Sequence, residues 1–271
     1  MAGVKILFLS ESCLLDPRSG AAREVATMLR VLAAAGHEAR SCTLGCFDGD
    51  PGAARAAARA ALDCERPGRV LRRVREGVEH RVLVPTTPAS SALQAWELRR
   101  YASLVQEELV RDLPDLILLY GGAPPSQALA DARRCGARVV FYVANPSYAQ
   151  RPSRLFEHCD AFIVPSEAAA RRYAPVLPRR PRVLRSLVDA PFEGRRNLTA
   201  DRIADRGDRA VTMINPEPAK GGLVFLNMVA QAQRHAPELR FRAVEGRWPL
   251  ARWQRAGIDP STLARLEWLP P

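Results

Sequence analysis

Short apolar segments alternate with amphipathic helical segments along most of this chain, and this alternation restricts the possible folds more than any other feature. Residues 4–9 read VKILFL, an uninterrupted apolar run typical of a strand buried on both faces of a sheet. The next apolar residues recur at helical spacing: Val25, Met28, Leu29, Leu32 and Ala33. Gly36 then ends the helix, and residues 39–44 form a second strand. The N-terminus therefore predicts a βαβ unit.

The alternation continues through the next 150 residues or so. Further strands are predicted at 78–84, 116–120, 138–143, 161–164 and 182–187. Helices are predicted at 94–113 and 126–135, and a helix N-cap at 165–167. Residues 51–64 are either an alanine- and arginine-rich helix or a mobile insertion. This order of elements predicts an α/β fold in which helices pack on a mostly parallel sheet.

A polar stretch divides the chain into two predicted domains. We expect a doubly wound, parallel-sheet domain over 1–196, a linker over 197–208, and a second Rossmann-like domain that begins at 209. In 209–271 we predict a strand at 210–214, a helix at 223–235, a strand at 239–244, helix and turn at 247–266, and a short strand at 266–269. These are fewer strands than a complete sheet of this kind needs, so we expect only the start of the second domain.

Membrane, disulfide and metal signals are weak in this sequence. No apolar run is long enough to span a bilayer, and the first residues lack the features of a signal peptide, so a cytoplasmic location is expected. The six cysteines form no Cys-x-x-Cys pair and are expected to be reduced. The four histidines are scattered without metal-ligand spacing, so we expect neither a metal nor a cofactor.

The net charge of +11 comes almost entirely from arginine, since Lys5 and Lys220 are the only lysines. The densest run, 66–75, is either a solvated surface or a patch that binds anions. Aromatic residues are not interleaved with these arginines, which argues against single-stranded nucleic acid. We expect no specific nucleic-acid partner, whereas peripheral contact with an anionic membrane stays an open alternative.

Two loops follow the first strand of a βαβ unit and lead into a helix, where free backbone N–H groups and the helix dipole attract anions. The first contains Gly20 and Ala21, and its single glycine does not match the dinucleotide fingerprint. The second runs from Asn215 to Gly222 and places Lys220 immediately before Gly221. A lysine at this position can reach a phosphate as a flexible point charge, although a chance surface lysine is the alternative.

Several segments occur together in a recognisable order: the VKILFL strand, the Ser-Gly loop, the helix that ends in AGHE, the DAFIVPS segment at 160–166 and the Asn-Pro-x-Pro-x-Lys-Gly loop. In this combination the chain resembles the retaining, nucleotide-sugar-dependent glycosyltransferases of family 4, which have the two-domain GT-B fold. The resemblance implies an N-terminal domain that holds the acceptor and a C-terminal domain that holds the nucleotide sugar. It also implies chemistry that generally needs no metal.

The resemblance also implies roles for individual residues. Lys220 would contact the donor diphosphate, together with Asn215 and Gly221, and Gly20 and Ala21 would line the donor side of the cleft. Residues near the sugar or acceptor would be Tyr120, Gly121 and Asn145. No catalytic residue is singled out, and the acceptor class is not indicated.

The sequence departs from the family pattern in ways that favour an alternative. Asn215 stands where the family often has arginine, and the paired-glutamate segment that grips the donor sugar is expected downstream of Pro271. The alternative is a truncated, non-catalytic remnant or binding module of the family, with contact to an anionic membrane as an accessory property.

Overall fold

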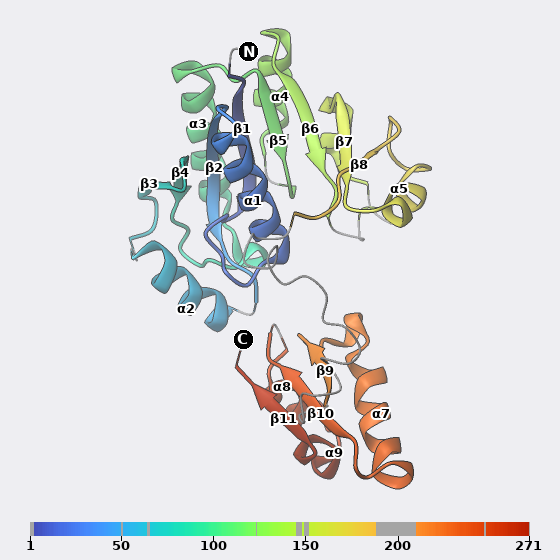
Figure 1. Ribbon diagram of the computed structural model, residues 1–271. Helices are drawn as coiled ribbons and strands as arrows, with labels where there is room; N and C mark the ends of the chain where they lie inside the picture. Colours follow the sequence, from blue (N-terminus) through green and yellow to red (C-terminus); the bar gives the residue numbers. More distant parts are fainter. Residues whose placement is uncertain are drawn as a thin grey trace. The chain divides into compact units, whose positions relative to one another are not determined.

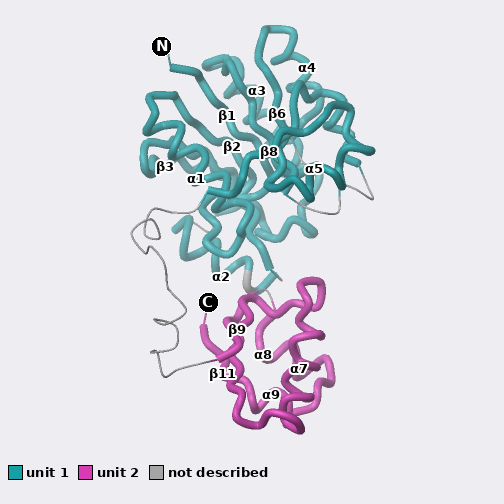
Figure 2. Tube along the Cα trace, turned by 45° about the vertical axis from the view of Figure 1, so that its right-hand side comes forward, with its two compact units in different colours: residues 1–189 teal, residues 190–271 magenta. Residues whose placement is uncertain are grey.

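The computed structural model describes two compact units, 1–189 and 190–271, each with its own sheet and core (Figures 1 and 2). The described residues are 3–49, 51–63, 66–122, 124–144, 148, 152–187, 210–246 and 248–270. The predicted linker, 197–208, lies outside them.

Unit 1 is built on an eight-stranded sheet with the order β3-β4-β2-β1-β5-β6-β7-β8. Its strands are β1 (Lys5–Ser12), β2 (Glu38–Cys46), β3 (Val70–Arg75), β4 (Val78–Leu83), β5 (Leu116–Leu119), β6 (Arg138–Tyr142), β7 (Ala161–Val164) and β8 (Arg182–Val183). The β3–β4 pair is antiparallel, and the other described pairs in this sheet are parallel. The predicted mixed α/β fold with a large parallel sheet is confirmed, although β8 is shorter than predicted.

Helices cover both faces of this sheet (Figure 1). They are α1 (Gly20–Ala34), α2 (Pro51–Leu62), α3 (Ala95–Arg111), α4 (Ser126–Arg134) and α5 (Glu167–Tyr173). Side chains of β1 alternate between two core clusters: Leu7 and Leu9 pack with α3 and α4, whereas Ile6 and Phe8 pack with α1. All four are buried, which is why the strand reads as a continuous apolar run instead of alternating with polar residues.

Strand β3, which forms a hairpin with the predicted strand β4, is the main element that the sequence analysis missed. Glu76 and Gly77 connect the two strands with φ angles of 51° and 79°, the pair of positive angles that a tight type I′ turn requires. The arginine-rich run therefore contains an edge strand. Its exposed charges at Arg72, Arg73 and Arg75 protect the sheet edge against pairing with another chain.

Unit 2 has a three-stranded parallel sheet with the order β11-β10-β9. Its elements are β9 (Ala210–Ile214), the short 3-10 helix η5 (Pro218–Lys220), α7 (Gly222–His235), β10 (Arg240–Val244), α8 (Leu250–Arg255), α9 (Pro260–Ala264) and β11 (Leu266–Leu269). The mixed segment predicted at 247–266 thus contains two short helices. Trp253 is 1% exposed and lies at the centre of this unit's core with Phe225, Val229 and Phe241.

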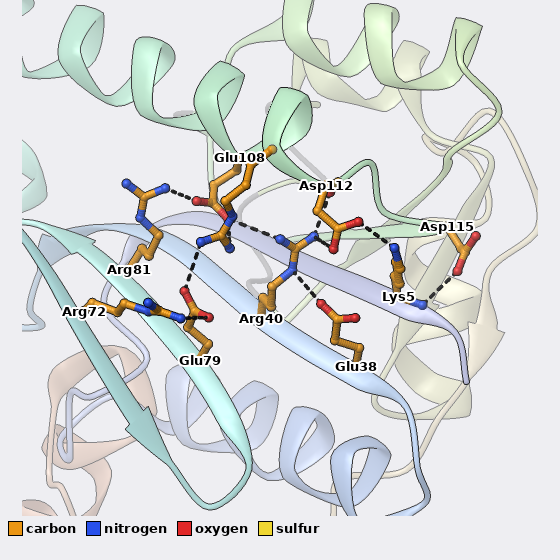
Figure 3. A network of polar contacts seen from close by, with 10 residues as sticks. Lys5, Glu38, Arg40, Arg72, Glu79, Arg81, Glu108, Asp112 and Asp115 are labelled. Atoms are coloured by element: carbon orange, nitrogen blue, oxygen red, sulfur yellow. Dashed lines mark hydrogen bonds and ion pairs between the residues drawn. The ribbon is translucent and has the colours of Figure 1, made fainter. Parts of the chain in front are cut away.

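A network of charged side chains joins β1, β2 and β4 of unit 1 to the C-terminal end of α3 (Figure 3). Glu108 of α3 has a side chain 1% exposed and forms ion pairs with Arg40, Arg81 and Arg111. Arg40 also donates a 2.8 Å hydrogen bond to the carbonyl of Asp112, whose carboxylate accepts a 2.6 Å bond from Lys5. Lys5 begins β1, so this end of α3 is anchored near the amino ends of the strands.

Candidate functional site

The strand order of unit 1 creates a switch point between β1 and β5. From β1 the chain proceeds through α1 to β2 on one side, whereas β5 pairs with β1 on the other side and follows α3 on the opposite face. In open α/β sheets, ligands bind outside the carboxyl ends of the strands at such a point. This edge therefore forms the candidate site of unit 1.

Glu11 occupies this switch point and was not singled out in the sequence. It lies near the end of β1, and both of its carboxylate oxygens accept a hydrogen bond of 3.0 Å from the backbone N–H of Gly122. Gly121 has φ +87°, and a Cβ atom there would overlap the carboxylate of Glu11. The predicted glycine at 121 is thus required by both its backbone angle and the approach of Glu11. A carboxylate two residues after the apolar run 4–9 was the available signal.

Tyr120 and Gly121 follow β5 directly, so they lie at this edge as the sequence predicted. Tyr120 is half-buried and packs against the core cluster between the sheet and α1. Asn145, the third residue predicted near the sugar or acceptor, lies outside the described residues.

Gly20 and Ala21 form the first turn of α1, and this turn begins at the same edge. Ser19 caps the helix by accepting a 3.4 Å hydrogen bond from the N–H of Ala22, and the first turn contains no acidic side chain. A Cβ atom at Gly20 would have no neighbouring atom within 4 Å, so its backbone adjoins open space. The turn therefore presents an unobstructed, positively polarised helix end.

A buried polar pair lies between α1 and β6. One carboxylate oxygen of Glu24 and the hydroxyl of Tyr142 are buried and form no hydrogen bond within the described part of the chain. Burial, followed by the nearby Glu24 carboxylate, raises the pKa of Tyr142 above its ordinary value. Tyr142 therefore stays a neutral phenol at physiological pH.

In unit 2, Asn215 shapes the turn that follows β9. It has φ +52°, its backbone N–H donates a 2.8 Å bond to the carbonyl of Val244, and its side chain lies against the backbone of Gly246. A Cβ atom at Gly246 would overlap the Asn215 amide, so these two residues fit together where β9 and β10 end. Asparagine is one of the residues that tolerate this left-handed conformation.

Lys220 and Gly221 lie at the N-terminal end of α7. Gly221 is the N-cap, with φ +88° and no side-chain cap, and the first turn contains no acidic residue. The ammonium of Lys220 is 3.8 Å from a carboxylate oxygen of Glu217, and the lysine side chain is 52% exposed. At Gly222 a Cβ atom would lie 2.8 Å from Trp253 and 2.9 Å from the carbonyl of Glu217, so only glycine fits there. The predicted loop thus combines a half-exposed cation with a helix terminus that has no side-chain cap.

The predicted residues form two groups, each at the carboxyl edge of its own sheet. Gly20, Ala21, Tyr120 and Gly121 belong to unit 1, and Asn215, Lys220 and Gly221 belong to unit 2. Within the described ranges, no three His, Cys, Asp or Glu side chains gather in a way that could hold a metal ion. None of the described helices is long and apolar enough to cross a membrane.

Comparison with known proteins identifies the family and the fold of the chain. A model of the family described as Glycosyltransferase Family 4 matches residues 18–190, well over half of the chain. A search of curated proteins finds no match.

Similar solved structures include sucrose-phosphate synthase from Thermosynechococcus elongatus, with a TM-score of 0.62 and 14% identity over 98% of this chain and 70% of that one. Anabaena HepE in complex with UDP and glucose has a TM-score of 0.55 and 15% identity over 98% and 69% of the two chains. A Listeria monocytogenes protein provisionally described as a UDP-N-acetylglucosamine 2-epimerase has a TM-score of 0.56 and 11% identity, over 100% and 70%. At these identities the likeness concerns the fold alone, and that fold is of the GT-B type.

Proposed function

Because the chain belongs to glycosyltransferase family 4, we propose that it transfers a sugar from a nucleotide-diphosphate sugar to an acceptor with retention of the anomeric configuration. The observation that carries this proposal is the N-terminal end of α7, which has no side-chain cap and where Lys220 precedes a left-handed Gly221. The diphosphate of the donor would bind there, and the acceptor would bind at the carboxyl edge of the unit 1 sheet.

The donor end needs no metal in this proposal. A leaving diphosphate develops negative charge as the sugar departs, and an ammonium group together with backbone N–H groups can stabilise that charge. Lys220 provides the ammonium, and α7, which is 14 residues long, provides the helix dipole. Asn215 and Gly246 set the course of the loop, Gly221 supplies its left-handed turn, and Gly222 lets the start of α7 pack against Trp253.

The acceptor end would be built around Glu11, Tyr120 and Gly121. The carboxylate of Glu11 is held by the N–H of Gly122 at the switch point, so it is oriented before any substrate arrives. A fixed carboxylate can accept hydrogen bonds from sugar or acceptor hydroxyl groups. Gly20 and Ala21, at the start of α1, would contact the donor, as the family resemblance implies.

Two further observations support the proposal. HepE, which shares the fold, is described in complex with UDP and glucose, so we take UDP as the first nucleotide to test. The described cysteines are free, and burial raises the pKa of Cys13 and of Cys159 to about 12, so both thiols are neutral and unreactive. Buried free thiols favour a reducing compartment, and we propose the cytoplasm.

The donor site is tested by calorimetric titration of UDP into the full chain. We expect Lys220→Ala to weaken UDP binding at least tenfold, because a charge-assisted contact contributes about 1.5–3 kcal/mol. The matched control is Arg234→Ala, which removes one positive charge from the last turn of the same helix. It should leave UDP affinity within about twofold, since it lies at the opposite end of the helix dipole.

Glu217→Gln is the complementary variant. The carboxylate of Glu217 pairs with Lys220 and repels a phosphate, so its neutralisation should strengthen UDP binding, most clearly at low salt. Equal UDP affinity in the wild type, Lys220→Ala and Glu217→Gln would exclude this loop as the diphosphate site.

Transfer itself is tested with a panel of nucleotide sugars and acceptors, with products identified by NMR. A glycoside that keeps the donor's anomeric configuration supports the proposal, and an inverted product contradicts retention. Epimerised nucleotide sugar without transfer would instead favour the chemistry ascribed to the Listeria neighbour. UDP binding without any turnover would favour a non-catalytic binding module.

A further inference from the structure

A small cavity lies at the carboxyl edge of the unit 1 sheet, beneath α2. Its volume is about 270 Å³, close to the lower end of the range for small-molecule sites, which is about 300 Å³. Its floor is formed by Gly45 near the end of β2 and by Val84 and Pro85, which follow β4. β2 pairs with β1 on one side and with β4 on the other, so the cavity lies at the carboxyl edge that also carries the switch point.

The floor is held by hydrogen bonds that do not depend on a ligand. Buried Glu97 of α3 accepts a 2.5 Å bond from the N–H of Thr86, and the N–H of Phe47 donates a 2.7 Å bond to the carbonyl of Pro88. A Cβ atom at Gly45 would lie only 3.1 Å from the Pro85 ring, so the two strand ends approach closely there. The cavity is therefore shaped by the fold before a ligand binds.

One face of α2 forms the wall of this cavity. Its four lining residues, Arg55, Ala58, Arg59 and Leu62, are spaced i, i+3, i+4 and i+7 and therefore lie on a single stripe of the helix. Every other residue of α2 is alanine, glycine or proline, so its only two charged side chains are both on this stripe.

The residues that line the cavity combine positive charge with apolar surface. The exposed side chains of Arg55 and Arg59 line the cavity together with apolar residues, and none of the described lining residues is acidic. The apolar lining residues include Ala58, Leu62, Val84 and Pro85. Guanidinium forks match the geometry of carboxylate and phosphate oxygens. The apolar wall matches the C–H face of a small organic ligand, and the volume excludes a large one.

We propose that the acceptor carries a phosphate or carboxylate group and that Arg55 and Arg59 bind this group in the cavity beneath α2. This inference rests on the proposed function, because it takes the unit 1 edge as the acceptor side. It adds the acceptor class, a small anionic molecule, which neither the family nor the fold specifies. The two arginines act as binding and specificity residues and take no part in the chemical step.

The test compares three titrants on the full chain by calorimetry at low salt: glucose 6-phosphate, glucuronate and neutral glucose. We expect at least one of the two anions to bind at least tenfold more tightly than glucose, and the tighter one identifies the preferred group. The double variant Arg55→Ala/Arg59→Ala should lose at least tenfold in affinity for that anion. Because alanine is the best helix former, α2 should persist, as circular dichroism can verify.

Two control variants separate the site from general charge. Arg171→Ala/Arg172→Ala removes two exposed positive charges from α5 and should retain anion affinity. Arg55→Lys/Arg59→Lys keeps the charge but removes the planar forks, and its affinity should be intermediate. Equal anion binding in the wild type and in Arg55→Ala/Arg59→Ala would overturn the inference, as would two anions that bind no better than glucose.

UDP titrated into the same samples separates this inference from the proposed function. UDP should bind the wild type and Arg55→Ala/Arg59→Ala equally, because its site is assigned to Lys220 in unit 2. If UDP binds and neither anion does, the acceptor class is wrong and the donor proposal stands. If the anions bind at Arg55 and Arg59 and UDP does not bind at all, the acceptor role falls together with the donor proposal.

Discussion

At the scale of single residues, side chains that look equivalent in the sequence have different environments in the structure. Four histidines look equally scattered in the sequence, yet His80 is 4% exposed and its Nδ1 lies 2.8 Å from the hydroxyl of Ser41. Burial, with the nearby positive charge of Arg75, lowers the pKa of His80 to about 4. Such a residue is neutral when the chain is folded and becomes charged when it unfolds in mild acid.

His80 should therefore make the stability depend on pH. In the unfolded chain the His80 imidazole binds a proton below about pH 6.5, whereas in the folded chain it does so only near pH 4. The contribution of His80 to the free energy of unfolding therefore falls as the pH decreases from about 6.5 to about 4, and it does not change with pH above this window. Between pH 7.5 and 4.5 the loss from this group is about 2–3 kcal/mol.

Urea unfolding at several pH values measures this dependence. His80→Asn keeps a polar side chain near Ser41 but cannot be protonated, so its stability should decline less than that of the wild type over the same window. Parallel decline in the two proteins would show that His80 does not titrate on unfolding in the way described.

Residue chemistry also explains which site residues could be predicted. Lys220 stood out because the chain has only two lysines, and the glycines after it are needed for the backbone to turn. Glu11 did not stand out, because nothing in its local sequence indicates that Gly121 and Gly122, over a hundred positions away, will meet its carboxylate. For Arg55 and Arg59 the sequence indicated only positive charge. That both line a cavity follows from the positions of β2 and β4, whose ends form the floor of that cavity.

At the scale of elements, the attachment of α3 to the sheet depends on buried charge. Glu108 has to balance three arginines, Arg40, Arg81 and Arg111, from three different elements. Lys5 and Arg40 of this network lie in the amino-terminal halves of β1 and β2 and contact the C-terminal end of α3 (Figure 3). We therefore assign this network to stability and not to ligand binding.

Glu108→Gln tests this assignment. The substitution leaves Arg40 with a buried charge and less compensation, so the free energy of unfolding should fall by about 3–5 kcal/mol. Glu107→Gln is the matched control on the next residue of the helix, because its side chain is 47% exposed and its ion pairs lie at the surface. That control should change stability by less than about 1 kcal/mol. Similar losses in both variants, measured by chemical denaturation, would contradict a special role for the buried carboxylate.

The elements also show where pattern reasoning fails. Long periodic helices such as α1 and α3, and apolar strands such as β1, were predicted closely because their own side chains carry the signal. The edge strand β3 was missed because its outward residues are arginines and its stability comes from pairing with β4. Whether 51–64 is a helix or an insertion could not be decided from alanine alone, since the buried face of α2 exists only where it packs against residues of β3 and β4.

At the scale of the whole molecule, the chain consists of two units with separate cores. The core clusters of unit 1 and the cluster around Trp253 in unit 2 share no residue. Two units with separate cores can unfold independently, so we expect more than one unfolding transition.

The tryptophans allow this to be measured. Three of the four, Trp248, Trp253 and Trp268, belong to unit 2, and Trp96 belongs to unit 1. Tryptophan fluorescence should therefore report mainly on unit 2, whereas far-UV circular dichroism reports mainly on the larger unit 1. We expect the two probes to give different urea midpoints.

Trp96→Phe is the matched control, since it removes the unit 1 fluorophore and should leave the fluorescence midpoint unchanged. Coincident transitions by both probes, in the wild type and in this variant, would show instead that the two cores unfold as one cooperative unit.

The sequence by itself determined the class of the fold, the order of the strands and helices along the chain, and the family, because hydrophobic periodicity, glycines and the Lys-Gly loop are local properties. Tertiary structure alone decided that Glu11 meets Gly122, that Glu108 balances three arginines, and that Arg55 and Arg59 face a cavity. Each of these depends on contacts between residues far apart in the chain. Such contacts form only when strands and helices from distant parts of the chain pack together, and no local pattern records them.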